Sequence, residues 1–356
     1  MTGLYIHIPF CKSKCAYCDF LSYVGKEKYI ENYIDSVISE AAEYGGQIAD
    51  TVFIGGGTPS VLPEGEIKRL LDGVKKHIEF TDAAEITAEA NPNSLTKEKA
   101  EEYKSAGINR VSLGLQTANA RLLKRIGRTH TFEDFFNAVS FLRAAGIENI
   151  NADIIYSLPS QTIGDIEDTV KKLILLDIPH VSAYALKLEP GTPLFKENPE
   201  LPDEDTDRRM FYLIRDMLKK EGVFRYEISN FAKPGYECAH NLKYWRVEDY
   251  IGLGAAAHSC FNGRRFYNPH SLTGYISGEK RGEEPVDFEY EKIMLGLRLT
   301  EGIDKELLKP AKLAVKRLKE WGLLTVEGKR AFLTDRGMDV ENAVLAEIFE
   351  EMEKNA

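Results

Sequence analysis

Apolar residues follow two alternating patterns along the first two thirds of the chain. Short runs rich in β-branched and aromatic residues predict about six strands, at residues 4–8, 51–54, 85–89, 110–115, 151–155 and 180–186. Longer stretches place apolar residues at helical spacing, first at Ile30, Tyr33, Ile34, Val37, Ile38 and Ala41, then at Ile67, Leu70, Leu71 and Val74. Strands that alternate with helices form parallel sheets, and this pattern fits both an open doubly wound sheet and a partly closed barrel.

The alternation ends at about residue 235, and we expect three regions: residues 1–235, a connector at 236–286, and a small domain at 287–356. In the last region, residues 290–299 and 313–321 predict helices, and residues 323–333 predict a hairpin that turns at Glu327 and Gly328. Helices followed by a hairpin indicate a winged-helix-like domain. Such a domain can bind DNA, act as a lid or dock a partner, and the fold alone does not decide between these roles.

Polar and glycine-rich segments follow the first four predicted strands. They are the cysteine-containing loop after strand one, Gly55-Gly56-Gly57-Thr58 after strand two, Glu89 to Pro92 after strand three, and Gln116-Thr117 after strand four. Because active sites of parallel α/β folds lie at the carboxyl ends of the strands, we expect these segments to share one rim.

Cys11, Cys15 and Cys18 are spaced by three and then two residues. Three close thiolates can bind a four-iron cluster and leave one iron open to a small molecule. Disulfides are not favoured, because five cysteines in 356 residues without an apolar signal segment are typical of a protein of the reducing cytoplasm. A structural zinc site lacks a second close cysteine pair, although His7 or a distant residue could complete one, and purely apolar packing also stays open.

The composition is that of a protein without membrane spans or a general affinity for nucleic acid. No apolar run approaches the roughly 20 residues that a membrane-spanning helix requires. The net charge of −10 opposes phosphate binding, which normally requires a basic face. Lys124, Arg125 and Arg128 form a local basic group, which suits a solvated face or an anion contact within one site.

These residues resemble the radical S-adenosylmethionine superfamily, whose signature is this cysteine spacing with an aromatic residue, here Tyr17, before the last cysteine. The resemblance continues through Gly-Gly-Gly-Thr-Pro, Glu89, Gln116, Arg128 and Asp153, and covers essentially the whole chain. Within the superfamily the chain is similar to the oxygen-independent coproporphyrinogen oxidase group, and most similar to its haem-chaperone branch. The resemblance implies a partial (β/α)6 barrel with a small C-terminal domain.

The resemblance also implies that Cys11, Cys15 and Cys18 hold a 4Fe-4S cluster whose open iron takes the amino and carboxylate groups of S-adenosylmethionine. The residues implied to line that ligand's pocket are Tyr5, Tyr17, Gly56, Gly57, Thr58, Glu89, Gln116, Arg128 and Asp153. Their chemistry suits the ligand, since a carboxylate can bind its cationic groups and Arg128 its carboxylate. Each of them, taken singly, could equally be an ordinary polar residue at a strand end.

Two departures separate the chain from the oxidase. Position 20 is Phe20, where the oxidase pattern has a fourth cysteine, and only ten residues precede Cys11, which we expect to leave no room for the N-terminal segment that encloses the porphyrin. The haem-chaperone branch carries a His-Asn-x-x-Tyr-Trp motif associated with haem binding, matched here by His240, Asn241, Tyr244 and Trp245. Imidazole is a common haem-iron ligand, but the same residues could pack in a core. Cys238, His258 and Cys260 are weaker candidates.

The sequence therefore predicts a cytoplasmic haem chaperone that delivers haem to apo-haemoproteins, without nucleic acid binding or direct membrane insertion. A radical enzyme of porphyrin biosynthesis is the alternative, and a winged-helix nucleic-acid protein is a remote one. Whether S-adenosylmethionine is cleaved or only bound, and whether the protein is a monomer or a homodimer, stay open.

Overall fold

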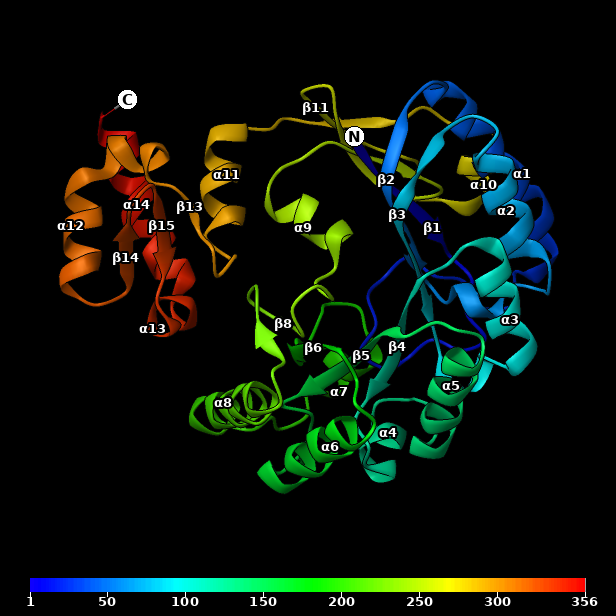
Figure 1. Cartoon of the computed structure of the whole chain (residues 1–356), viewed down its shortest axis with the longest axis horizontal. Coiled ribbons are helices and arrows are strands. Elements are labelled where there is room, and N and C mark those ends of the chain that lie inside the picture. Colours follow the sequence, from blue (N-terminus) through cyan, green and yellow to red (C-terminus); the bar gives the residue numbers. More distant parts are fainter. Residues whose placement is uncertain (356) are drawn as a thin grey trace.

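Six parallel strands form the centre of the computed structural model, which describes residues 1–355. They pair in sequence order, as Figure 1 shows. Their bounds are β1 Thr2–Ile8, β2 Ile48–Gly56, β3 Glu79–Ala90, β4 Arg110–Gln116, β5 Asn149–Tyr156 and β6 His180–Ala185. Each contains or overlaps one predicted run, so the prediction of six parallel strands is confirmed.

The sheet extends beyond both ends of this set, in the order β12-β11-β10-β9-β1-β2-β3-β4-β5-β6-β8-β7. The added strands are β7 Phe224–Arg225, β8 Asn230–Ala232, β9 Tyr250–Leu253, β10 His258–Phe261, β11 Arg264–Tyr267 and β12 Gly282–Glu284. Among residues 1–355 no strand pairing joins the two outer edges, so the barrel is partial.

Residues 236–286, which we expected to be a connector, carry four of these strands together with two short helices, α9 Ala239–Trp245 and α10 Leu272–Ile276. Strand β9 pairs parallel with β1 and continues the central sheet. The four strands are only three or four residues long, too short for an alternating pattern to be detected in the sequence.

Most helices of the βα units cover the outer face of the sheet (Figure 1), whereas Leu122 and Leu194, on the two shortest of these helices, pack with Tyr17 of the cysteine loop. Their bounds are α1 Ile30–Ala41, α2 Glu66–Val74, α3 Lys97–Ala106, α4 Ala120–Arg125, α5 Phe132–Ala144, α6 Ile163–Leu175, α7 Pro193–Glu197 and α8 Glu204–Lys220. Helices α5 and α6 begin with capping boxes at Thr131 and Thr162, whose hydroxyls accept from backbone N–H groups in the first turn. Both apolar stripes predicted from the sequence face the core, in α1 and α2.

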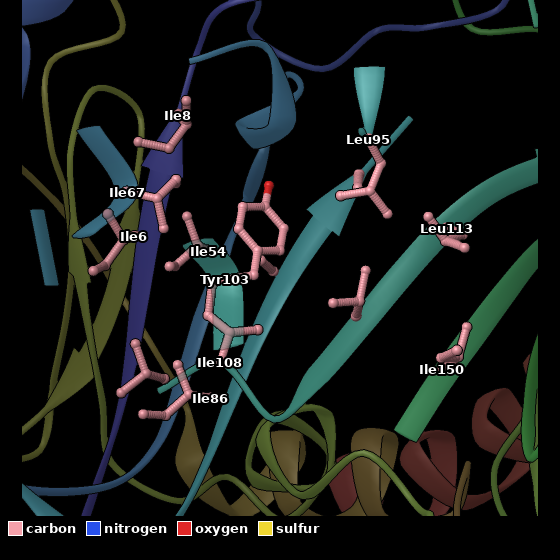
Figure 2. Packing of buried hydrophobic residues seen from close by; sticks show 14 of the residues in the cluster. Ile6, Ile8, Ile54, Ile67, Ile86, Leu95, Tyr103, Ile108, Leu113 and Ile150 are labelled. Carbon is pink, nitrogen blue, oxygen red and sulfur yellow. The ribbon is translucent and has the colours of Figure 1, made fainter. Parts of the chain in front are cut away.

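Side chains alternate between the two faces of the central strands. Ile6, Ile54, Ala88, Val111 and Ile150 are register partners across five strands and belong to the apolar core. Figure 2 shows Ile6, Ile54 and Ile150 in this core with Ile67 and Tyr103. The intervening positions, which face the inside of the barrel, hold polar residues on β3 to β5 and Phe53 and Gly55 on β2.

The C-terminal domain has a core of its own and a three-stranded sheet in the order β13-β15-β14. It consists of α11 Phe288–Gly296, β13 Ile303–Asp304, α12 Lys312–Glu320, β14 Leu324–Glu327, β15 Arg330–Leu333, α13 Asp335–Asp339 and α14 Glu341–Asn355. The two predicted helices and the hairpin are present. In Figure 1 the domain lies beside the barrel, and Tyr212 on α8 donates a hydrogen bond to Asp339 on α13. Within residues 1–355, no helix has the length and apolar character that crossing a membrane requires.

Candidate functional site

A cavity of about 140 Å³ lies at the carboxyl ends of the strands. The residues that line it come from the cysteine loop, from the ends of β2 to β5 and from the segments that follow them. Those predicted from the sequence are Cys11, Cys15, Tyr17, Cys18, Gly56, Gly57, Thr58, Glu89, Gln116, Arg128 and Asp153. The expectation that these strand ends share one rim is confirmed, and what they bind stays a prediction.

The cysteine loop is tied to the barrel through its backbone. The Cys11 N–H donates to the carbonyl of Tyr23 at 3.0 Å, and the Ala16 N–H donates to the carbonyl of Ile126 at 3.0 Å. All five cysteines are free thiols. Within residues 1–355, no three metal-binding side chains converge closely enough to hold a single ion. A cubane cluster spreads its cysteines over different irons and therefore does not require the three thiols to converge on a single ion.

His7, the residue that could have completed a zinc site, is occupied by other contacts. Its Nε2 lies 3.0 Å from the carbonyl of Leu21 and its Nδ1 lies 2.9 Å from the hydroxyl of Tyr5. Burial lowers the pKa of His7, which keeps the ring neutral. His7 therefore positions the cysteine loop through the Leu21 carbonyl, and both its nitrogens are engaged.

The glycines at the end of β2 are required by close backbone packing. A Cβ on Gly57 would lie 2.8 Å from the carbonyl oxygens of Ile8 and Phe10, and Gly56 has φ +109°. The Gly57 N–H donates to the Ile8 carbonyl at 2.8 Å, and the Gly56 N–H donates to Glu89 Oε2 at 3.0 Å. The glycines thus allow the end of β2 to pack against the backbone at the start of the cysteine loop. A close approach of ligand to their N–H groups stays a prediction.

Arg128 joins the cysteine loop to β4. Its Nη1 donates to Cys15 Sγ at 3.5 Å, and its Nη2 donates to Asn91 Oδ1 at 2.8 Å and to the Gly114 carbonyl at 2.6 Å. Thr58 also contacts the loop, with its Oγ1 3.4 Å from Cys11 Sγ. The Arg128 guanidinium beside Cys15 places a positive charge in this cavity, which suits anionic ligands.

Two carboxyl groups line the floor of this cavity. Burial, followed by the charge of Asp153, raises the pKa of Glu89 to about 8, and the N–H of Gly56 opposes the shift. Burial also raises the pKa of Asp153, although Ser112 and Asn151 donate to its oxygens at 2.9 and 2.7 Å. A cation placed between these groups would lower both pKa values and be bound by the resulting carboxylates.

A second cavity, of about 210 Å³, lies inside the barrel, and we call it the lumen. It is lined by Tyr5, Phe53, Glu89, Arg110, Ser112, Asn151, Asp153, Ser182, Tyr184, Asn241 and Tyr244. Glu89, Ser112 and Asp153 line both cavities, so the lumen adjoins the cysteine loop's cavity. Tyr5, which we predicted with the residues of the cysteine loop's cavity, lines only the lumen.

The predicted haem motif lies on α9, and its four residues have different surroundings. Asn241 and Tyr244 line the lumen. His240 is fully buried, with Nδ1 2.9 Å from Thr51 Oγ1 and Nε2 2.8 Å from the Tyr244 hydroxyl, and it stacks on Phe53. Burial lowers the pKa of His240 to about 3. Both ring nitrogens of His240 therefore have partners inside the protein, which agrees with the alternative that the motif residues pack in a core.

Trp245 does not line the lumen, so the two aromatic residues of the motif do not form one platform there. The Arg298 guanidinium lies 5.4 Å from the centre of its ring, and its Nε1 is buried without a hydrogen-bond partner. Of the weaker candidates, Cys238 and Cys260 are buried, and burial raises the pKa of the Cys238 thiol to about 12. His258 is partly exposed beside Tyr267, far along the sheet on β10.

Several lining residues were missed in the sequence. They are Gly114 in the first cavity, and Arg110, Ser112, Asn151, Ser182 and Tyr184 in the lumen. The signal was present, because polar residues occupy alternate positions of the runs 110–115, 151–155 and 180–186. Such alternation in strands that helices cover on one side indicates a polar interior.

Comparisons with known proteins agree with this geometry. The chain matches the radical SAM superfamily over residues 5–173 and the HemN C-terminal domain over residues 285–340. The heme chaperone HemW of Lactococcus lactis subsp. lactis (strain IL1403) is 38% identical, over 96% of this chain and 95% of its own. The heme chaperones HemW of Bacillus subtilis (strain 168) and Escherichia coli (strain K12) are 35% and 37% identical, over 99% and 84% of this chain and 100% and 83% of theirs.

A solved structure shares the fold. It is that of coproporphyrinogen III oxidase (HemN) from Escherichia coli, a radical SAM enzyme. The TM-score is 0.86 at 21% identity, over 98% of this chain and 89% of that one. The predicted radical SAM barrel with a small C-terminal domain is therefore confirmed.

Proposed function

Because this chain belongs to the radical SAM superfamily, and within it to the family of the heme chaperone HemW, we propose that it binds haem and transfers it to apoproteins. The observation that carries the proposal is the identity of 38% with a HemW over 96% of this chain. The likeness to coproporphyrinogen III oxidase concerns the fold alone, and Phe20 stands where the oxidase pattern has a cysteine. Coproporphyrinogen decarboxylation is therefore the alternative that the experiment below tests.

The cavity at the strand ends would hold a 4Fe-4S cluster and S-adenosylmethionine. Cys11, Cys15 and Cys18 are the thiolate donors that such a cluster requires, and they line one cavity. When bound, the cluster supplies one-electron chemistry and an open iron, which no side chain provides.

The surrounding residues would bind and orient the second ligand. Arg128 holds the Cys15 side of the loop and faces the same cavity, where it can neutralise a carboxylate. Glu89 and Asp153 would attract the ligand's cationic groups, and Glu89 would release its proton when a cation binds. Tyr17, Gly56, Gly57, Thr58 and Gln116 complete the wall, and Tyr5 would act from the lumen side.

The haem motif would act through the lumen. Asn241 and Tyr244 line it, whereas His240 holds α9 against β2 through Thr51 and Phe53. Haem ligation by His240 would require the ring to leave this packing. We further propose a cytoplasmic protein that does not bind nucleic acid, with residues 1–235, 236–286 and 287–356 as its three regions.

The test is anaerobic reconstitution of the full chain followed by two assays on one sample. We expect haem to bind with a stoichiometric Soret band, and coproporphyrinogen to keep its propionates when S-adenosylmethionine and a reductant are present. Decarboxylation at enzymatic turnover, or a protein that does not bind haem, would refute the proposed function. A Cys11→Ala, Cys15→Ala, Cys18→Ala triple variant serves as the cluster control, and we expect it to contain no iron or sulfide.

A further inference from the structure

Arg110, on β4, is a buried cation without a counter-ion in direct contact. Its side chain is 2% exposed and is one of the largest fully buried side chains. Within residues 1–355 it forms no ion pair at 4.0 Å or less, and its Nε has no hydrogen-bond partner. Arginine is almost never buried in this way unless it is paired.

The nearest carboxylates have other partners. Glu85 accepts from the backbone N–H groups of Ala239 and His240 at 2.9 and 3.0 Å, at the start of α9. Asp153 accepts from Ser112 and Asn151, and Glu89 accepts from the backbone of Gly56. These charges act on Arg110 only at longer range, so its guanidinium is available to an anion from outside the chain.

The lumen around Arg110 provides neutral groups that suit a carboxylate. Asn241 can donate from its amide. Tyr244 can donate from its hydroxyl in the tautomer in which His240 accepts from Thr51 at Nδ1 and donates from Nε2 to the Tyr244 oxygen, and burial raises the pKa of Tyr244 so that the phenol keeps its proton. A volume of about 210 Å³ accommodates a short side arm that ends in a carboxylate, but not a tetrapyrrole ring.

The lumen adjoins a space large enough for the ring. A cavity of about 710 Å³ lies beside the ends of β5 and β6, against α8 and α13. Its lining includes Tyr156, Phe211 and Arg225, and Tyr184 lines both this outer cavity and the lumen. Aromatic faces suit a flat macrocycle, and a side arm that passes Tyr184 would enter the lumen that Arg110 lines.

We propose that Arg110, assisted by Asn241 and Tyr244, binds a propionate carboxylate of haem inside the lumen while the macrocycle occupies the outer cavity. This inference rests on the proposed haem-binding function and specifies how the motif on α9 serves it. The motif then recognises the edge of the haem, and His240 keeps α9 in place.

The test compares haem with haem dimethyl ester, whose propionates carry no charge, on anaerobically reconstituted full-length protein. We expect the wild type to bind haem at least 10-fold more tightly than the diester. Arg110→Met should bind both equally, and Arg110→Lys should keep part of the difference. Arg143→Met is the matched control, because Arg143 donates to the Leu176 carbonyl on the outer face, and it should discriminate as the wild type does.

S-adenosylmethionine also carries a carboxylate, so the experiment must distinguish its binding to Arg110 from that of haem. S-adenosylmethionine affinity should change less than threefold in Arg110→Met. A 10-fold loss of S-adenosylmethionine affinity with retained discrimination against the diester would assign Arg110 to that ligand and overturn the inference. Retained discrimination alone would also overturn it, whereas a wild type that binds neither form of haem would refute the proposed function and the inference with it.

Stability provides an independent readout. Because Arg110 lacks a direct partner, the melting temperature of ligand-free Arg110→Met should equal or exceed that of the wild type. A clearly lower melting temperature would show that Arg110 serves the fold and would contradict the assignment. If Arg110→Met does not fold, the comparison of haem with its diester in Arg110→Lys still decides the outcome.

Discussion

His240→Ala tests whether the histidine of the α9 motif serves the fold or the haem iron. The ring is fully buried, contacts Thr51 Oγ1 at 2.9 Å and the Tyr244 hydroxyl at 2.8 Å, and stacks on Phe53 with ring centres 5.4 Å apart. Removing the ring leaves two hydroxyls without partners, at about 1 kcal/mol each, and the vacated volume adds about 2 kcal/mol. We therefore expect the free energy of unfolding to fall by about 4 kcal/mol in total.

The assay is urea unfolding at pH 7, followed by far-ultraviolet circular dichroism on haem-free protein. His258→Ala is the matched control, because its side chain is 42% exposed, and it should change the free energy of unfolding by less than ~0.5 kcal/mol. The pH dependence adds a signature. Since burial lowers the pKa of His240 from 6.5 to about 3, its stabilising contribution is complete above pH 6.5 and is lost as the pH falls towards 3.

The stability difference between wild type and His240→Ala should therefore shrink on acidification. A variant within ~1 kcal/mol of the wild type that nevertheless loses the haem Soret band would refute the packing role and identify His240 as an iron ligand.

Three further substitutions test the rim. Glu89→Gln should flatten the pH dependence of the free energy of unfolding, measured without S-adenosylmethionine. Burial raises the pKa of Glu89 from 4.5 to about 8. In the wild type, the contribution of Glu89 to stability is therefore complete below pH 4.5 and is lost as the pH rises through 8. Thermal melts from pH 5 to 9 check this, and equal slopes would contradict it. Gly57→Ala should destabilise the protein by about 2 kcal/mol and lower its iron content, because the new Cβ would meet two backbone oxygens at 2.8 Å; unchanged iron would refute the reasoning. Arg128→Met should weaken S-adenosylmethionine binding by roughly 10-fold or more in calorimetry, since it removes a charge-assisted contact, and undiminished affinity would exclude that role.

The central strands were predictable because their β-branched runs are long and are separated by helices with clear apolar stripes. The cysteine loop and its rim followed from the rule that strand ends meet at one edge. Strands β9 to β12 were not predictable, because three or four residues do not establish a period and the pairing of β9 with β1 joins segments more than 240 residues apart.

The lumen and the surroundings of His240 depend on tertiary packing. The polar positions of β4, β5 and β6 are visible in the sequence, but their convergence on one cavity follows only from the curvature of the sheet. The motif on α9 likewise gave the residue types, whereas the position of α9 against β2 determines which of them face the lumen. Arg110 illustrates this point, because a strand arginine gives no sign in the sequence that its guanidinium lacks a partner.

The most direct test of the account is haem transfer from the reconstituted protein to an apo-haemoprotein. In one arm the two proteins are mixed. In the other arm they are separated by a dialysis membrane that small molecules cross but neither protein does. Spectra are recorded over time in both arms. We predict that the acceptor's Soret band grows only when the two proteins can meet, while the donor loses haem in equal amount. Transfer at the same rate in both arms, or retention of all haem by the donor, would contradict a chaperone function.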